Sequence, residues 1–256
     1  MIRRLFYFGL LVLLTPLVYA FAYEGALYLI SVFTFDATQW FLLGAAVGLP
    51  ISLLILNNNT TFIEHLLHEL EHAAISFLFT LQWPRRMEVD PQQGSRVYVP
   101  PRGGCLVTLA PYYFPMLTIP FLLLKALATL LFSLLELPFP ALLEAVLDLL
   151  IGATLMFHYV STLREFRLSQ SDIRETGFIV SIVGVLFLNL MFLVVSLAVV
   201  TGRYAEFLEY LKAAVATTVE AYKAAFEFLK TQLLPALDDL MQTPKIHPAK
   251  VAAQVG

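Results

Sequence analysis

The residues of this chain best suited to chemistry are His68, Glu69 and His72, which belong to the pentapeptide His-Glu-Leu-Glu-His. They lie in an apolar stretch that predicts a helix from about Thr61 to Leu81. Residues four apart share one face of an α-helix, so both imidazoles can bind one Zn²⁺ at about 2.0–2.1 Å. A carboxylate next to the first ligand can take a proton from the metal-bound water. The pattern therefore predicts a hydrolytic zinc centre with His68 and His72 as ligands and Glu69 as general base.

A catalytic zinc site uses three protein ligands and keeps one position for water. The candidates outside the motif share a side chain that can ligate a metal: His65, Asp148, His158, Glu165, Asp172 and Glu175. His65 lies near the start of the motif helix and is expected to be structural. If the apolar runs were straight parallel helices rising about 1.5 Å per residue, Asp148 would lie at nearly the depth of the motif histidines. Depth alone therefore favours Asp148 as the third ligand.

The composition indicates a membrane protein. Of 256 residues, 59% are hydrophobic and 14% are charged, whereas a globular domain is about one-quarter charged. Six apolar runs are each close to or above the roughly 18–20 residues that cross a bilayer: 5–22, 39–56, 61–82, 105–132, 139–161 and 177–200. We therefore predict an all-α polytopic integral membrane protein with about six transmembrane helices, in contact with the lipid bilayer. The net charge of −3 does not indicate a nucleic-acid partner.

Two features of the ends of these runs leave alternatives open. The first run follows Arg3 and Arg4 and contains Ala20-Phe21-Ala22, so a cleaved signal peptide is the alternative to a retained first span. With six spans, Arg3 and Arg4 lie on the side opposite to most later arginines, and the positive-inside rule does not fix the orientation. Cys105 is the single cysteine, which excludes an intramolecular disulfide and a site built from several thiolates.

The segment Arg85–Pro100, directly after the motif helix, alternates apolar and polar residues around the turn-rich stretch Asp90–Gly94. This pattern predicts a short β-hairpin, with an irregular surface loop as the alternative. An unpaired strand edge can bind an extended peptide through main-chain hydrogen bonds. Val97, Tyr98 and Val99 are therefore the predicted substrate-binding residues.

The fourth apolar run contains Pro111, Pro115 and Pro120, so its helix is predicted to be kinked or broken. A broken helix can line a cavity, whereas a kink can serve packing alone.

The chain changes character after residue 202. Residues 203–241 predict an amphipathic helix whose apolar positions alternate at spacings of three and four. Its charges nearly balance, which favours pairing with a partner helix or a homo-oligomer through residues 204–234 over binding to anionic lipid. We predict a membrane-embedded domain at 1–202, with its core at 60–200, and a disordered end at 242–256.

Beyond these patterns, the chain resembles the site-2 protease family of intramembrane zinc metallopeptidases. The resemblance covers about residues 60–200 and depends on three segments: the motif His68–His72, Gly103-Gly104-Cys105-Leu106 with Ala110-Pro111, and Ser161–Arg164 with Ser171-Asp172 and Thr176-Gly177. The last segment looks like the compact bacterial branch, in which a Ser-Asp pair before a final span supplies the third ligand. The family's Asn-x-x-Pro and Asp-Gly signature is not matched, since Ile173 follows Asp172 and His158 stands where such proteins often carry Asn.

The resemblance implies Zn²⁺ held by His68, His72 and Asp172, with Glu69 as general base. It also implies a membrane protein or peptide as substrate and a bacterial cytoplasmic membrane as location. We therefore predict a zinc endopeptidase that cleaves transmembrane or membrane-proximal peptide bonds. The alternative is a non-enzymatic membrane subunit whose polar helix binds a metal or haem, or only packs, and which acts through its C-terminal helix. Glu69 favours the enzyme, because a structural or haem site does not need that carboxylate.

Overall fold

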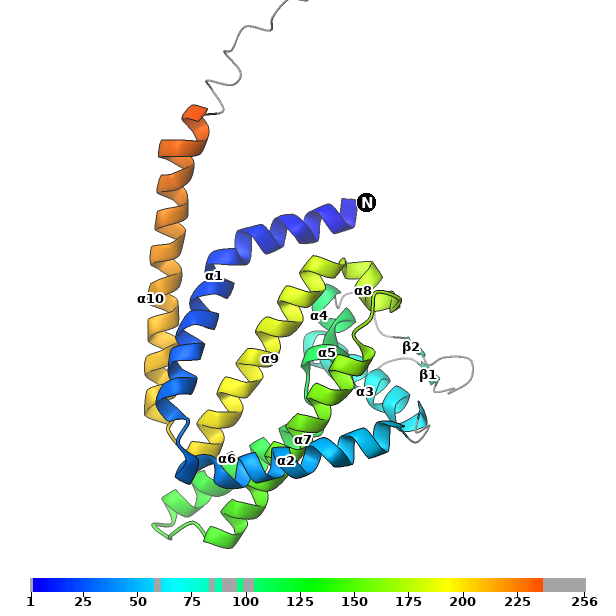
Figure 1. Ribbon diagram of the computed structural model, residues 1–256, viewed down its shortest axis with the longest axis vertical. Helices are drawn as coiled ribbons and strands as arrows, with labels where there is room; N and C mark the ends of the chain where they lie inside the picture. The colour runs from blue at the N-terminus through cyan, green and yellow to red at the C-terminus, as the bar shows by residue number, and fades with distance from the viewer. Residues whose placement is uncertain (1, 58–60, 83–85, 89–95, 99–103, 237–256) are drawn as a thin grey trace, which may run out of the picture.

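The computed structural model describes residues 2–57, 61–82, 86–88, 96–98 and 104–236, and most of them are helical. The elements in chain order are α1 (Ile2–Val32), α2 (Phe35–Asn57), α3 (Thr61–Thr80), β1 (Arg86–Glu88), β2 (Arg96–Tyr98), α4 (Gly104–Thr108), α5 (Ala110–Tyr113), α6 (Ile119–Leu134), α7 (Ala141–Glu165), α8 (Ser171–Thr176), α9 (Phe178–Thr201), α10 (Tyr204–Phe228) and the π-helical turn η1 (Leu229–Leu233). Helix α9 contributes to the cores of two groups of helices. The first group comprises α1, α2, α6, α7 and α10, and the second comprises α3, α4, α5 and α8 (Figure 1).

Four of the described helices, rather than the six predicted, are long and apolar enough to cross a membrane: α1, α2, α7 and α9. The motif run fails this criterion because α3 carries the ionisable side chains of the motif. The fourth run fails because its prolines divide it, as predicted, into α4, α5 and the shorter apolar helix α6. Pro111 and Pro120 each lie in the first turn of a helix, where a missing N–H removes no helical bond.

Helices α2 and α7 contact each other through their backbones. A Cβ at Gly44 would lie 2.0 Å from the carbonyl oxygen of Leu149, and one at Gly152 would lie 2.0 Å from that of Phe41. Small residues permit this separation, and membrane helices commonly pack in this way. The contact fixes α7, which carries Asp148 near its start and Glu165 at its end.

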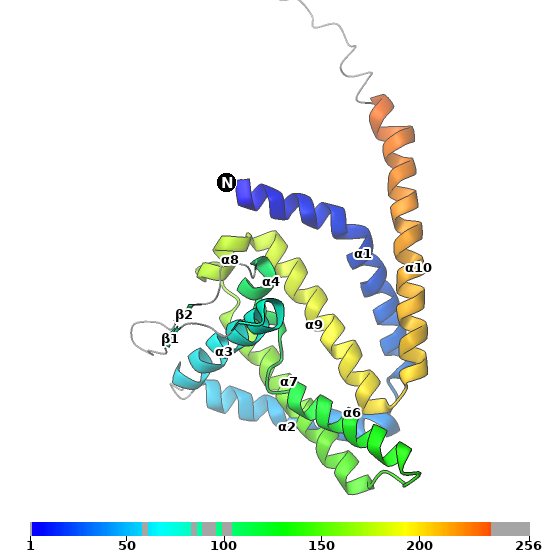
Figure 2. The ribbon, with the colours of Figure 1, turned by 180° about the vertical axis from the view of Figure 1, so that it is seen from behind.

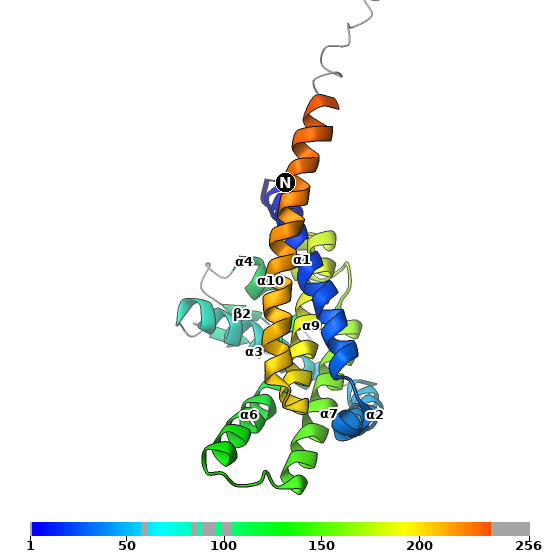
Figure 3. The ribbon, with the colours of Figure 1, turned by 90° about the vertical axis from the view of Figure 1, so that its left-hand side faces the viewer.

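The predicted amphipathic C-terminal helix corresponds to α10, which lies along α1 and extends beyond the rest of the molecule (Figures 1 and 3). Tyr210 is buried in a core to which α1, α2, α6, α7, α9 and α10 contribute, and the hydroxyl of Thr217 donates to Glu24 at 2.7 Å. Helix α1 is continuous to Val32 and changes direction along its length, and Pro16 is the internal proline that accounts for a bend. Helix pairing therefore occurs within the protein. Pairing with another chain stays a prediction, and the predicted end at 242–256 lies outside the described residues.

Helices α3, α4, α5 and α8 form the second group, on the side of α9 away from α10 (Figure 2). Its core contains Val107, Tyr112 and Ile173. In the segment where a hairpin was predicted, β1 and β2 pair antiparallel, with Met87 opposite Val97. Val99 lies outside the described residues. Gly177, at φ +93°, turns the chain from α8 into α9, which brings α8 against α4.

Candidate metal centre

Three side chains that can ligate a metal converge between α3 and α8. His68 and His72 lie one turn apart on α3, and Asp172 is the second residue of α8. One ligand atom from each side chain lies within 4.8 Å of the other two. All three residues are at least partly buried. The structure thus brings together the two motif histidines and the aspartate that the family resemblance implied.

The separations of the two imidazoles from Asp172 match a small tetrahedral site. The Nε2 atoms of His68 and His72 lie 3.4 and 3.6 Å from Oδ2 of Asp172. Two ligands bound at 2.0–2.1 Å around a tetrahedral zinc ion are about 3.3 Å apart. The donor set of two imidazoles and one carboxylate is also one that catalytic zinc sites use. The residues present therefore fit a zinc ion.

The outer nitrogens of both imidazoles are already engaged. Nδ1 of His68 lies 2.9 Å from Oε2 of Glu165, at the end of α7, and Nδ1 of His72 lies 2.7 Å from the main-chain carbonyl of Val107. When an ion is bound, both acceptors would keep the imidazole proton on Nδ1 and leave Nε2 to ligate the metal. Metal-binding histidines are commonly held in this way by a carboxylate or a carbonyl oxygen.

The charges of this cluster depend on one another. Burial acts to lower the pKa of His68, but hydrogen bonds to Asp172 and Glu165 prevail and raise this pKa to about 10. Burial acts to raise the pKa of Asp172, but hydrogen bonds from the two histidines hold it well below the usual range. Asp172 is therefore ionised at neutral pH, and it is the anionic ligand of the group.

Glu69 lies next to the ligands and is mostly buried, with 6% of its surface exposed. Burial raises the pKa of Glu69, while the nearby His72 and His68 act to lower it. In the described part of the chain its carboxyl forms no hydrogen bond, so it is free to accept a proton. This environment suits a general base, for which a pKa nearer neutrality is an advantage.

Tyr112 is a site residue that the sequence did not indicate. Its hydroxyl donates to Oδ2 of Asp172 at 3.4 Å, and its ring lies edge-on to that of His68. The main-chain carbonyl of Tyr112 accepts hydrogen bonds from the amide of Asn189 at 2.7 Å and the hydroxyl of Thr162 at 3.4 Å. Helices α7 and α9 thus fix this residue beside the ligands. The side chain of Asn189 therefore supports Tyr112.

The remaining candidates have other partners or lie outside the ligand group. Asp148 forms a buried ion pair with Lys125, whose ammonium also donates to the carbonyl of Val200 at 2.8 Å. Nε2 of His158 lies 3.2 Å from the side-chain oxygen of Asn189. Glu165 orients His68, and neither His65 nor Glu175 belongs to the group. The depth argument for Asp148 was wrong because α3 packs in the second group of helices and is not a span parallel to α7.

Comparisons of this chain with protein-family models, with curated proteins and with solved structures returned no match.

Proposed function

We propose that this protein is a membrane-embedded zinc endopeptidase that cleaves transmembrane or membrane-proximal peptide bonds. One observation carries the proposal: the two motif histidines turn their Nε2 atoms toward an ionised aspartate, while a buried carboxyl stands beside them. A structural metal site would not need Glu69. The resemblance to the site-2 protease family supports the same activity.

The roles of the residues follow from their positions. His68, His72 and Asp172 would hold the ion, and a bound Zn²⁺ supplies acidity to water and polarises a carbonyl. Glu69 takes the proton of the attacking water and returns it to the nitrogen of the leaving amine. Glu165 and the carbonyl of Val107 keep the imidazoles in the ligating tautomer.

The apolar helices around the candidate metal centre suit a substrate that lies in the membrane. Helices α1, α2, α7 and α9 are long and apolar enough to span a bilayer, and we propose a bacterial cytoplasmic membrane. We also propose that an extended substrate strand pairs with the edge of β2 at Val97 and Tyr98, because β2 contacts α3. Val97→Pro removes a main-chain donor, so it should slow cleavage of a protein substrate with zinc retained. Unchanged turnover in this variant would argue against strand pairing.

The decisive experiment compares Glu69→Gln with the wild-type protein purified in mild detergent. We expect hydrolysis of a membrane-spanning peptide to fall by about 10²–10⁴-fold, because a general base contributes that much. Zinc content should stay close to one ion per chain, because Glu69 is not a ligand. Glu227→Gln, an exposed change on α10, is the matched control.

Two results would refute the proposal. Full activity in Glu69→Gln would exclude its role as base. Zinc-loaded wild-type protein that cleaves no membrane peptide would instead favour a non-enzymatic metal-binding subunit.

A further inference from the structure

The chain between α7 and α9 joins two candidate membrane spans. Residues 163–179, which we name the α7–α9 connection, run from the last turn of α7 through α8 to the first residues of α9 (Figure 1). Both α7 and α9 are long and apolar enough to cross a bilayer. A segment that joins two such spans lies at the membrane surface, whichever way the protein is oriented.

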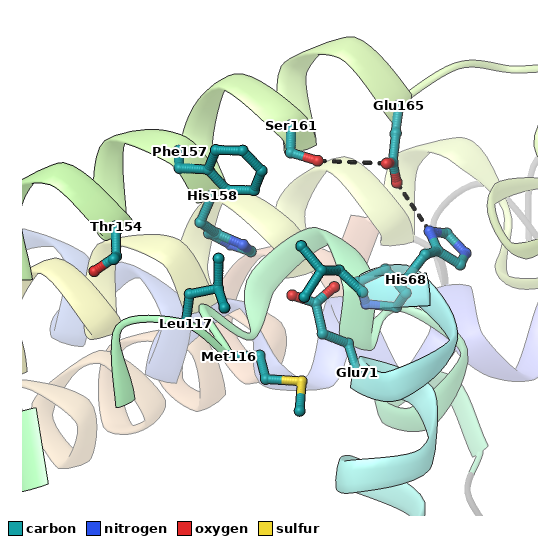
Figure 4. Close-up of a pocket in the computed structure, with 11 residues that line it drawn as sticks. His68, Glu71, Met116, Leu117, Thr154, Phe157, His158, Ser161 and Glu165 are labelled. Carbon is teal, nitrogen blue, oxygen red and sulfur yellow. Dashed lines mark hydrogen bonds and ion pairs between the residues drawn. The ribbon is translucent and has the colours of Figure 1, made fainter. Parts of the chain in front are cut away.

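Two of the three acidic side chains of this connection turn into the protein. Oε2 of Glu165 lies 2.9 Å from Nδ1 of His68, and its other carboxylate oxygen accepts from the hydroxyl of Ser161 at 3.3 Å (Figure 4). Asp172 faces the motif histidines. Glu175 is the third acidic residue, and it is exposed. The outer surface of the connection therefore carries one carboxylate.

The three basic side chains of the connection are exposed instead: Arg164, Arg167 and Arg174. Nε of Arg167 donates to the main-chain carbonyl of Arg164 at 2.9 Å, which holds Arg167 against the end of α7. Arg174 follows Asp172 by two residues, so it lies on the opposite side of α8 from the metal centre. A guanidinium has five N–H donors and can bind a phosphate bidentately while it keeps a protein partner. The outer surface is thus basic, with three positive charges against one negative charge.

Large apolar side chains are exposed among these arginines. Leu163 is 81% exposed and Leu168 is 66% exposed, and Phe178 and Ile179 at the start of α9 are also exposed. At a bilayer surface, such side chains enter the acyl region while guanidinium groups stay at the level of the headgroups. An acidic peptide in water would pair with the arginines but would leave the leucines in water. The mixture of side chains therefore favours a lipid surface as the partner.

The opposite ends of α7 and α9 lack this basic character. The segment 135–140 before α7 carries one charged residue, Glu136, and the segment 202–203 after α9 carries one, Arg203. The positive-inside rule therefore places the α7–α9 connection on the cytoplasmic side. The cytoplasmic leaflet has a negative surface potential because it contains anionic lipids. The charge of the connection is complementary to that leaflet.

We propose that the outer surface of the α7–α9 connection binds the phosphate groups of anionic phospholipids. Its three arginines contact the phosphates, while Leu163 and Leu168 lie among the upper acyl chains. The bound lipid contacts α8, the short helix that carries one of the candidate metal ligands. This inference does not depend on the proposed peptidase activity, because it concerns the opposite face of α8.

The test uses the full-length protein in micelles of a mild detergent that contain equal amounts of dioleoylphosphatidylglycerol and dioleoylphosphatidylcholine. Native mass spectrometry measures how much of each lipid the protein retains. An arginine close to an anionic surface contributes about five-fold to binding, so we expect a preference for phosphatidylglycerol of about 10- to 100-fold. The variant Arg164→Gln/Arg167→Gln/Arg174→Gln should bring this ratio close to one, and each single variant should lower it about five-fold.

The variant Lys212→Gln/Lys223→Gln/Lys230→Gln is the matched control, because it removes three positive charges from exposed positions on α10 and η1. Its lipid preference should equal that of the wild type, and the melting temperature in detergent shows which variants are folded. The single arginine variants keep the test decisive if the triple arginine variant does not fold.

Four results would overturn the assignment. The first is equal retention of the two lipids by the wild-type protein. The second is an unchanged preference in the folded arginine variants, and the third is an equal loss in the lysine control. The fourth is displacement of phosphatidylglycerol by millimolar inorganic phosphate or by a glutamate-rich peptide, which would identify a site for a soluble anion or an acidic protein segment instead.

Discussion

Two buried ionic clusters lie at opposite ends of α7, and they differ in how their charges are balanced. Near its start, Asp148 is paired with Lys125, and the same ammonium donates to the carbonyl of Val200 near the end of α9. At its end, Glu165 binds His68, which with His72 surrounds Asp172. The first cluster contains its own permanent cation. The second consists of carboxylates and imidazoles, and the described residues supply no lysine or arginine to it.

This difference separates a structural cluster from a candidate ligand site. The charge of Asp148 is already balanced by a lysine that a main-chain carbonyl also holds in place, so a metal ion would gain little there. Asp172 faces two Nε2 atoms whose outer nitrogens are held elsewhere, so a divalent cation can replace protons among three preoriented ligands. Both clusters contain a buried carboxylate, and of the two the second is the one in which three ligand atoms converge.

The most direct test of the difference between the two clusters replaces the carboxylate of each by an amide. Asp172→Asn should lower zinc affinity by at least about 100-fold, because an anionic ligand is replaced by a neutral amide. Asp148→Asn should keep close to one zinc ion per folded chain, because its partner is Lys125. Zinc content by mass spectrometry after dialysis against a weak chelator measures both.

Metal loss in Asp148→Asn together with retention in Asp172→Asn would reverse the assignment of the two clusters. His72→Ala supplies the reference level for a protein without a zinc site.

Local sequence patterns predicted the two histidines of the candidate metal site, but not the carboxylate that completes it. The spacing of His68 and His72 predicts two candidate ligands because residues four apart share a helix face, and that information is local. Asp172 came from a family resemblance, since no local rule links residues a hundred positions apart. The depth argument for Asp148 treated the apolar runs as straight parallel rods. It failed because α3 packs against α4 and α5 and is not one of the four candidate membrane spans, so its residue count does not give its depth.

The remaining parts of the site depend on tertiary contacts. Tyr112 reaches Asp172 because prolines break the fourth run, and the sequence indicated the break without the direction of the short helices. Val107 contributes only a main-chain carbonyl, which any residue type could supply. Lys125 gave no signal as a partner of Asp148, because the two lie on different helices joined by a long turn. Local patterns thus predicted most helices and two of the three candidate ligands, whereas the supporting residues depend on the fold.

The second prediction tests whether the Lys125 cluster is structural. Lys125→Met should reduce the free energy of unfolding by about 3–5 kcal/mol, because it leaves Asp148 buried and unpaired. The double variant Lys125→Met/Asp148→Leu should recover most of this loss, since an apolar pair of similar volume is often nearly neutral. Unfolding in mild detergent measures the stability. Zinc content should remain at the wild-type level in the folded double variant.

A single variant as stable as the wild type would show that the pair does not stabilise the contact of α6 with α7. Loss of zinc from the folded double variant would show that the two clusters are coupled along α7, against the separation argued above.

The smallest expected effect concerns Tyr112, which supports the ligand cluster and has no counterpart in the Lys125 cluster. Burial, together with the charges of Asp172 and Glu165, raises the pKa of Tyr112 above its usual range, so its hydroxyl stays protonated and donates. Tyr112→Phe removes that donor while keeping the ring against His68. Outer hydrogen bonds to metal ligands are worth about 10–100-fold in affinity. Since this bond is long, at 3.4 Å, we expect the lower limit, a zinc affinity reduced about 10-fold.

Tyr113 provides a matched control for this last change. It is the next residue, is similarly buried, and its hydroxyl donates to the main-chain carbonyl of Leu106 at 3.1 Å. Tyr113→Phe therefore removes a buried hydroxyl at the same helix without touching a metal ligand, and its zinc affinity should be that of the wild type. Competition with a chelator of known zinc affinity measures both variants. Equal affinities in the two variants would mean that Asp172 is oriented without Tyr112. A loss in both would mean that the packing of α5, and not the hydroxyl bond, sets the geometry of the site.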